Sequence, residues 1–378
     1  MPHDPLSWLA EREAERAASG LRRELRPRAA VETVIDLASN DYLGLARDPR
    51  VIQGAVDAVR IWGAGATGSR LVTGSTELHA ELEAELAAFC GTGAALVFSS
   101  GYTANLGAVT ALSGPGSLVV SDAGSHASLV DACRLSRARV VVVPSHDVGA
   151  VDAALAARAE SRAMVVTDSV GSADGELAPL SALLAVCRAR RATLLADEAH
   201  GLGVRGAGGR GLAAELGLSG APELVLTATL SKSLGSQGGV VLATPAVVEH
   251  LVNVARPFIF DTALAPAAAG AALAALRVLN VEPALPERVL AAAAAIATAA
   301  GVREPSSAVT SVILGATQRA VDAAAECLAR GVLVGCFRPP SVPEGTSRLR
   351  LTAHAGLSGD DLARVADVLT AVLAGDRG

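Results

Sequence analysis

Short apolar runs alternate with helix-length segments between residues 77 and 243, and this pattern restricts the possible folds more than any other feature. The apolar runs are Ala94–Phe98, Ser117–Val120, Arg139–Val143, Ala163–Thr167, Thr193–Ala196, Leu224–Ala228 and Gly239–Ala243. The helical segments are Glu77–Phe89, Thr103–Ala111, Ser125–Arg137, Val151–Arg158 and Leu180–Arg190. Apolar strands that alternate with helices form a mostly parallel sheet covered on both faces. We therefore expect an α/β fold with a mostly parallel seven-stranded sheet flanked by helices.

The length of the chain, 378 residues, exceeds what one ordinary core supports and predicts two lobes. An N-terminal segment, residues 1–45, leads into a large α/β domain that we place at residues 46–260. Beyond it the sequence turns to Ala-rich helices with short strands at Val309–Leu314 and Leu349–Thr352. This last part, residues 261–378, predicts a small C-terminal α+β domain.

The mean hydropathy of +0.41 suggests a membrane protein at first, but alanine accounts for most of it. The most apolar stretches, such as Ala265–Ala275 and Val289–Ala300, are short, Ala-rich and bounded or interrupted by Pro, Gly or charge. None supplies the roughly 18 strongly apolar residues that a spanning helix requires. We expect packed helices and no membrane span.

Cysteine usage and charge restrict the compartment and the partners. Five scattered cysteines without a Cys-x-x-Cys pair argue against a disulfide framework or a zinc site, and no metal is expected. The N-terminus lacks a basic stretch followed by an apolar one, so no secretory signal is visible, and the scattered cysteines fit a cytoplasmic protein. A net charge of -6 argues against a nucleic-acid partner.

Polar side chains with chemical potential follow the predicted strands, where each strand ends. Open α/β sheets bind ligands at the carboxyl ends of their strands, so these residues are expected to meet at one edge. In chain order they are Ser99 to Tyr102, Asp122, His126, Asp168 to Ser172, Asp197, His200, Thr229 and Lys232.

Lys232 and Asp197 form the most informative pair in this set. A lysine just past one strand and an aspartate at the end of another are what pyridoxal phosphate requires. The lysine forms a Schiff base with the aldehyde, and the aspartate keeps the pyridine nitrogen protonated so that the ring accepts electrons. If the two residues converge, the protein is an enzyme that acts on an amino acid.

Each of these residues also has an ordinary structural interpretation. A lysine after a strand is usually a solvated surface residue, but small uncharged residues flank Lys232. His126 alone would more often cap a helix or fill a core, and Arg348 and Arg350 would more often be exposed strand residues. Because Lys232 and Asp197 occur together, the functional interpretation is favoured for the set, least so for Arg348.

Gly63 to Gly68 matches the dinucleotide fingerprint G-x-G-x-x-G, but that motif must follow a strand and open a helix. Here it follows the helical stretch Val51–Ile61, so we predict a loop and no nicotinamide site. The chain contains no P-loop, H-E-x-x-H or G-x-S-x-G motif.

With these residues in place, the chain resembles the α-oxoamine synthases, which are fold type I transferases dependent on pyridoxal 5'-phosphate. The resemblance covers nearly the whole length and implies that fold and that cofactor. Five motifs carry it: Ser39–Leu45, Thr67–Gly74, Ser125–Ser128, Asp197–Gly201 and Ser231–Gly235.

Within that family, residues 338–352 are most similar to the members that condense L-alanine with pimeloyl-CoA or a pimeloyl carrier protein in biotin biosynthesis. The alternatives are another α-oxoamine synthase, such as a glycine C-acetyltransferase, and a pyridoxal-phosphate aminotransferase or decarboxylase on the same fold. A non-enzymatic binding module is the least favoured, since it has no reason to carry Lys232 and Asp197 together. The resemblance also implies a homodimer with shared active sites, in which Thr262 reaches the phosphate across the interface.

The resemblance assigns roles to matching cofactor-binding positions. Lys232 carries the cofactor and Asp197 pairs with its ring nitrogen, while His126 lies over the ring and orients the substrate. Other contacts come from matching residues of neighbouring loops: Ser172 and His200 to the ring hydroxyl, and Gly101, Tyr102 and Thr229 to the phosphate.

Four further residues are assigned to the substrates. Arg350 binds the alanine carboxylate, which suits its fork-shaped guanidinium. Arg22, Asn40 and Ser341 face the substrates. Ser341 stands where the family usually has threonine, and Tyr102 stands where phenylalanine is common.

Overall fold

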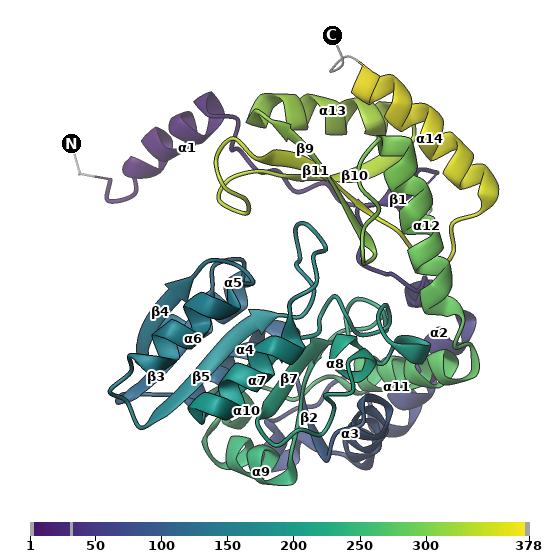
Figure 1. Ribbon diagram of the computed structural model, residues 1–378. Helices are drawn as coiled ribbons and strands as arrows, with labels where there is room; N and C mark the ends of the chain where they lie inside the picture. Colours follow the sequence, from purple (N-terminus) through teal and green to yellow (C-terminus); the bar gives the residue numbers. More distant parts are fainter. Residues whose placement is uncertain (1–3, 31–32, 375–378) are drawn as a thin grey trace.

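A seven-stranded sheet organises the larger of two lobes in the computed structural model, which describes residues 4–30 and 33–374 (Figure 1). The first three residues, at the N-terminus considered above, lie outside the described residues. The strand order is β2-β8-β7-β6-β5-β3-β4, and only β8 runs antiparallel to its neighbours. The strands are β2 (Ala94–Phe98), β3 (Ser117–Asp122), β4 (Arg139–Val143), β5 (Arg162–Asp168), β6 (Thr193–Asp197), β7 (Leu224–Thr229) and β8 (Gly239–Ala243). The predicted mostly parallel seven-stranded sheet is confirmed.

Helices cover both faces of this sheet, because successive side chains of a buried strand point to opposite faces and both sets are apolar. On β3, Leu118 and Val120 face one core and Val119 faces the other. The first core is covered by α3 (Glu77–Cys90), α6 (Val148–Ala156), α7 (Leu180–Arg190) and α11 (Pro266–Val281). The second is covered by α4 (Gly101–Leu112), α5 (Ala127–Ser136), α9 (Pro245–Val254) and α10 (Arg256–Ile259).

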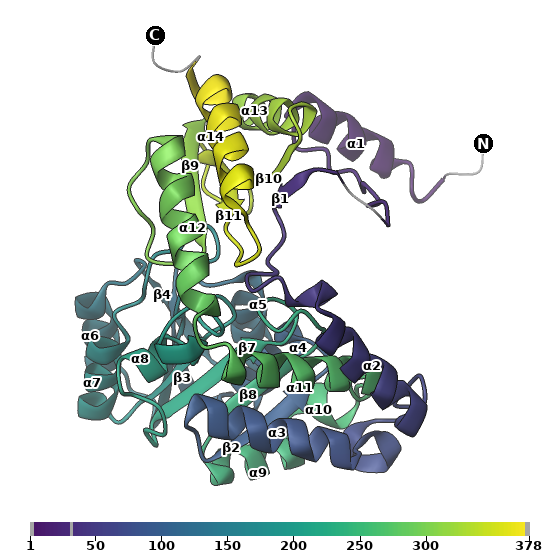
Figure 2. The same ribbon diagram turned by 90° about the vertical axis from the view of Figure 1, so that its right-hand side faces the viewer.

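The smaller lobe contains a four-stranded sheet of order β1-β10-β11-β9. Its strands are β1 (Ile35–Leu37), β9 (Val309–Gly315), β10 (Val332–Phe337) and β11 (Ser347–Thr352), and its helices are α12 (Leu285–Ala300), α13 (Thr317–Ala329) and α14 (Gly359–Leu373). β1 pairs with β10 in parallel, so the N-terminal segment lies in the C-terminal lobe, as Figure 2 shows. Helix α1 (Trp8–Ala18) precedes it, and the short α8 (Leu212–Glu215) belongs to the large lobe.

The chain passes from the large lobe to the small one between α11 and α12. α11 packs against α2 (Pro49–Trp62) and α3, whereas α12 packs against α14 and β9. Figure 2 shows α2, α3 and α11 together below the small lobe. The domain limits remain predictions, and this packing leads us to place the start of the small lobe near residue 284 rather than at 261.

Among the described helices, none is by itself both long and apolar enough to cross a membrane. α11 and α12 reach the required length only as a pair, and they are bent by 85° at the turn between them.

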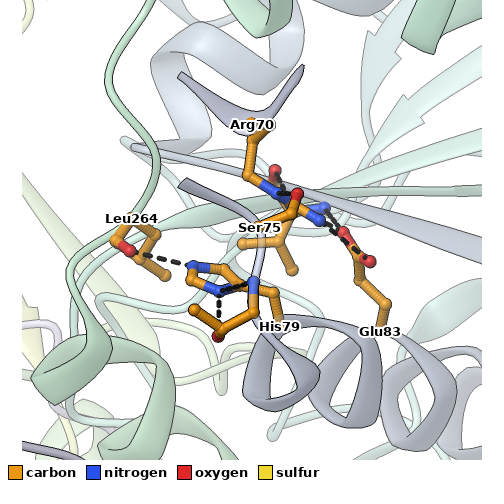
Figure 3. Close-up of polar contacts among 7 residues, drawn as sticks. Arg70, Ser75, His79, Glu83 and Leu264 are labelled. Carbon is orange, nitrogen blue, oxygen red and sulfur yellow. Dashed lines mark hydrogen bonds and ion pairs between the residues drawn. The ribbon is translucent and has the colours of Figure 1, made fainter. Parts of the chain in front are cut away.

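A buried ion pair fixes the Thr67–Gly74 motif to the large lobe (Figure 3). The Arg70 Nη1 lies 2.8 Å from Oε1 of Glu83 on α3, and its Nε donates to Ser75 Oγ at 2.7 Å. One turn earlier on α3, His79 Nε2 lies 2.9 Å from the carbonyl oxygen of Leu264. A buried charge requires such pairing, because an unpaired one loses its hydration without compensation. This motif, which helped to carry the resemblance, therefore has a structural role here.

Helices α2 and α11 approach so closely that only glycine fits at their crossing. A Cβ added to Gly54 would lie 2.6 Å from Ala274 Cβ and 2.8 Å from the carbonyl oxygen of Gly270. A Cβ added to Gly270 would lie 2.5 Å from the Gly54 carbonyl oxygen. The contact depends on backbone against backbone, which fixes the distance between the two helices.

We expect Gly54→Val to lower the free energy of unfolding by about 1–3 kcal/mol, since the added atoms must push the two helices apart. Urea denaturation followed by circular dichroism measures this loss. Gly359→Ala is the matched control: a Cβ there meets nothing within 4 Å, so a change under about 0.5 kcal/mol is expected. An equal effect of both substitutions would contradict the close-packing argument.

Candidate functional site

The carboxyl ends of β5, β6 and β7 bring three ionisable side chains to one edge of the large sheet. Asp168 ends β5 and Asp197 ends β6, and the two are register partners in neighbouring parallel strands. Lys232 follows the end of β7 by three residues. The convergence of Lys232 and Asp197 proposed from the sequence is therefore present in the fold.

The amine of Lys232 is partly buried, and its surroundings affect its pKa in opposite directions. Desolvation lowers its pKa from the ordinary value, although the carboxylates of Asp197 and Asp168 act in the opposite direction. Burial first, and then the neighbouring Asp197 carboxylate, raises the pKa of Asp168 well above its ordinary value. Within the described chain, Lys232 Nζ forms no hydrogen bond or ion pair. An amine with a lowered pKa and no protein partner is suited to covalent and proton-transfer chemistry.

The loop that carries Lys232 is held tightly by small residues. Gly235 has φ +58°, and a Cβ there would lie 2.4 Å from the backbone nitrogen of Ala46. Ser233 Oγ donates to the Leu202 carbonyl oxygen at 2.6 Å. The small residues that flank the lysine in the sequence thus allow the loop to pack against two other backbone segments.

Asp197 and His126 are connected through a buried side chain of α4. Asn105 Nδ2 donates to Asp197 Oδ2 at 2.7 Å and to Ser128 Oγ at 2.8 Å. Ser128 Oγ in turn lies 2.7 Å from His126 Nδ1. The backbone N–H of His126 donates to Asp168 Oδ2 at 2.9 Å. His126 as a whole residue is exposed, but its ring is partly desolvated, and its Nε2 forms no hydrogen bond within the described residues.

His200 is buried and is held by Tyr42 from the N-terminal segment. The Tyr42 hydroxyl lies 2.5 Å from His200 Nδ1. Burial first, and then the positive charges of Lys232 and Arg350, lower the pKa of His200 well below its ordinary value. The neutral form of His200 is therefore favoured, and its Nε2 forms no hydrogen bond within the described residues.

Arg350 on β11 extends from the small lobe to this edge. Its Nε donates to the Ser172 carbonyl oxygen at 2.7 Å, and its Nη1 donates to Asn40 Oδ1 at 2.9 Å. Its guanidinium also lies over the Phe337 ring, 5.3 Å from the centroid. Only 3% of Arg350 is exposed, and no carboxylate within the described residues forms an ion pair with it. The arrangement is a buried cation that lacks a protein counter-ion.

The start of α4 and the end of β7 lie together. A Cβ added to Gly101 would lie 3.1 Å from Thr229 Cβ, so the helix N-terminus packs against that residue. Thr229 Oγ1 lies 2.7 Å from Ser231 Oγ, and Tyr102 follows Gly101 in the first turn of α4. Hydroxyl groups beside the N–H groups of a helix start are suited to a phosphate.

Three predicted residues lie away from this cluster in the described structure. The exposed Arg22 side chain pairs with Glu13 at 3.1 Å and Glu24 at 3.3 Å. Ser341 lies in an exposed turn after β10, and its N–H donates to the Arg338 carbonyl oxygen. Thr262 is exposed and bridges to Ser69. Their roles toward substrates or the partner subunit remain predictions.

Two buried residues of the network were not assigned from the sequence. Tyr42 lies within a motif that carried the resemblance but was given no role of its own. Asn105 carried one available signal: it is a polar, poor helix former in the middle of an apolar helix. Such a residue requires buried hydrogen-bond partners, although the sequence does not say which ones.

The donor set fits pyridoxal phosphate. Lys232 offers an unpartnered amine, Asp197 a carboxylate with free lone pairs, and the α4 start a phosphate cradle. A lysine after β7 and an aspartate at the end of β6, on this sheet order, define a fold type I transferase dependent on pyridoxal phosphate.

Comparisons with known proteins agree with this class. Residues 32–369 match the family model "Aminotransferase class I and II". Curated relatives named 8-amino-7-oxononanoate synthase from Mycobacterium marinum (68% identity; 98% of this chain and 95% of the relative) and Mycolicibacterium vanbaalenii (67%; 98% and 97%) match. A structure of serine palmitoyltransferase from S. paucimobilis with a bound PLP–myriocin aldimine matches at 31% identity and TM-score 0.91, over 99% of each chain. The chain therefore belongs to the class I and II aminotransferases and, within them, to the 8-amino-7-oxononanoate synthase family.

We expect Tyr42→Phe to lower the free energy of unfolding by about 1–3 kcal/mol, because it leaves the buried His200 Nδ1 without its partner. Urea denaturation of the cofactor-free protein measures the loss. Tyr102→Phe is the matched control: it removes the same hydroxyl from an exposed tyrosine, so a change under about 0.5 kcal/mol is expected. Equal losses would contradict the importance of the buried contact.

Proposed function

We propose that this protein condenses L-alanine with a pimeloyl thioester, on CoA or a carrier protein, to form 8-amino-7-oxononanoate, carbon dioxide and the free thiol carrier. The observation that carries the proposal is the convergence of Lys232, Asp197 and Arg350 at one sheet edge. Full-length relatives at 67–68% identity that are named for this product support it.

Arg350 is proposed to bind the carboxylate of alanine. Among the described residues, the Arg350 Nη2 has only one long contact, 3.5 Å to the Tyr42 hydroxyl, so this end of the fork can still donate strongly. A substrate carboxylate would supply the counter-ion that the protein lacks, and charge-assisted pairs of this kind are strong. Asn40 and the Ser172 carbonyl hold the guanidinium in place while the carboxylate binds.

Lys232 is proposed to remove the proton from the alanine Cα. Pyridoxal phosphate, when bound, supplies an electron-withdrawing ring that stabilises negative charge at that carbon. Desolvation favours the neutral form of the Lys232 amine, and only the neutral amine can accept a proton. General-base assistance of this kind contributes roughly 10²–10⁴-fold in rate.

The remaining residues of the cluster are proposed to orient and hold. Asp197 would face the ring nitrogen, Thr229 and the α4 start would hold the phosphate, and His200 would donate to the ring hydroxyl. His126 would lie against the ring on its exposed side and orient the substrate. Each assignment pairs a hydrogen-bond donor of the protein with an acceptor of the cofactor, or an acceptor with a donor.

Mass spectrometry of the product formed from L-alanine and pimeloyl-CoA tests the function. We expect 8-amino-7-oxononanoate from the wild type and a loss of at least about 10³-fold in Lys232→Ala, given the combined base and tethering roles. Borohydride reduction should attach the cofactor label to the peptide that contains residue 232. Parallel assays with glycine, L-serine and acetyl-CoA separate the sister synthases.

Product from alanine without any acyl thioester would contradict the proposal and favour an aminotransferase or a decarboxylase. Product only with glycine and acetyl-CoA would favour a glycine C-acetyltransferase. A label on a different lysine would remove Lys232 from its role.

We also infer that the protein forms a homodimer through an exposed apolar surface, defined by Ile61, Leu71, Val72 and Phe260. Val72 is 78% exposed and Phe260 is 68% exposed. The segments that carry Leu71, Val72 and Phe260 adjoin, since Thr262 bridges to Ser69. Contiguous exposed apolar side chains usually mark a protein interface, and a second copy would cover them.

Val72→Glu should shift the protein toward monomer in sedimentation equilibrium, because a charge would be buried at the interface. Val281→Glu is the matched control. It changes a valine of similar exposure that lies away from the proposed surface. Val281 is next to Glu282, and Glu282 pairs with Arg50 at the start of α2, whereas Ile61 lies at the end of that helix. A monomeric wild type, or a dimer unaffected by Val72→Glu, would refute this surface.

The cytoplasm is the proposed location. All five cysteines are free in the structure and four of them are buried, which fits a reducing compartment.

A further inference from the structure

The side chain of Asn105 lies at the centre of a directional hydrogen-bond chain. It is 2% exposed and sits on α4 between Asp197, at the end of β6, and Thr227 on β7. Its Oδ1 accepts from Thr227 Oγ1 at 2.6 Å, and its Nδ2 lies 2.7 Å from Asp197 Oδ2. An ionised carboxylate only accepts, so the amide must turn its NH₂ group toward Asp197. The orientation of the amide is thereby fixed.

The second proton of the same NH₂ group determines what Ser128 does. Asn105 Nδ2 donates it to Ser128 Oγ at 2.8 Å, so that oxygen acts as an acceptor there. The single hydroxyl proton of Ser128 is then free for its other neighbour, His126 Nδ1, at 2.7 Å. The backbone N–H of Ser128 also points at Nδ1, at 3.3 Å. Two donors aimed at one ring nitrogen require that nitrogen to be the acceptor.

We propose that Asn105 and Ser128 are positioning residues, an inference that rests on the function proposed above. They keep His126 neutral with its proton on Nε2, and they connect its imidazole to Asp197 through hydrogen bonds. The Nε2 atom forms no hydrogen bond within the described residues, so its proton remains available to a ligand. His126 thereby becomes a fixed donor over the site rather than a base or a cation. The carboxylate that faces the cofactor ring and the imidazole that faces the substrate share one amide.

The charged groups around His126 decide how this arrangement responds to pH. Partial desolvation, and next to it the positive charge of Lys232, lower the pKa of His126, whereas Asp197 acts in the opposite direction. His200 couples to the same imidazole, and Asp168 holds its backbone N–H. A hydrogen bond from Ser128 to Nδ1 further favours the neutral ring. Activity should therefore fall as the pH drops through the pKa of His126.

The test is the pH dependence of kcat/KM in Ser128→Ala. Loss of the hydroxyl removes a donor to the neutral ring, so the acidic limb should move upward by about one pH unit, the equivalent of one typical hydrogen bond. Ser128→Thr keeps the hydroxyl and should restore the wild-type profile. Asn105→Ala should shift the acidic limb in the same direction. Without the N–H donor of Asn105, the Ser128 hydroxyl is no longer restricted to donating its proton to His126 Nδ1.

Ser125→Ala is the matched control. This serine lies next to His126, and its buried Oγ has no hydrogen-bond partner in the described structure, so the profile should stay unchanged. A uniform loss of activity in Ser128→Ala with the limb in place would indicate a purely structural role and overturn the proposal.

Nitrogen-15 spectra of the holoenzyme with labelled histidine separate this inference from the proposed function. The His126 signals, identified by their loss in His126→Gln, should show an unprotonated Nδ1 and a protonated Nε2 in the wild type. Ser128→Ala should show exchange between the two forms. Because this readout needs no turnover, it holds even if alanine and pimeloyl-CoA give no product. A wild-type His126 with its proton on Nδ1 would overturn the inference.

Discussion

The structure depends on how buried charges at one sheet edge are balanced. Lys232 lies near the carboxylates of Asp197 and Asp168, while Arg350 is buried and forms no ion pair with a carboxylate of the described chain. A charge removed from water loses hydration free energy unless an opposite charge pairs with it. In the free protein this loss lowers the stability of the fold. A cofactor or substrate of complementary charge would reduce this cost.

The two lobes contribute different parts of this set of charges. The large sheet supplies the lysine and the carboxylates, but the buried cation Arg350 comes from β11 of the small lobe. The loop between β5 and α7 connects the two lobes: a Cβ added to its Gly175 would lie 2.7 Å from the carbonyl oxygen of Val309 on β9. Figure 1 shows this loop rising from the large lobe toward the small sheet. This close backbone contact fixes the distance between the large sheet and the small-lobe strand that carries Arg350.

Two imidazoles share the site, and a hydroxyl group contacts the inner nitrogen of each. Tyr42 contacts Nδ1 of His200, and Ser128 contacts Nδ1 of His126. In both rings the inner nitrogen is occupied by the protein and the outer nitrogen is left to the ligand. Desolvation and neighbouring cations lower both pKa values, which favours the neutral form of each ring.

The sequence by itself determined the strands of the large sheet and the residues that follow them, such as Lys232 and Asp197. Both are local: a run of apolar residues forms a strand, and parallel strands end at a common edge. Only the tertiary structure decided that β1 joins β10, a strand absent from the sequence prediction, and that Arg350 meets Asn40 across 310 residues. It also decided the contacts of Tyr42 and Asn105. A buried polar residue requires hydrogen-bond partners, but the sequence does not identify them. Those partners depend on how distant elements pack, which no local pattern encodes.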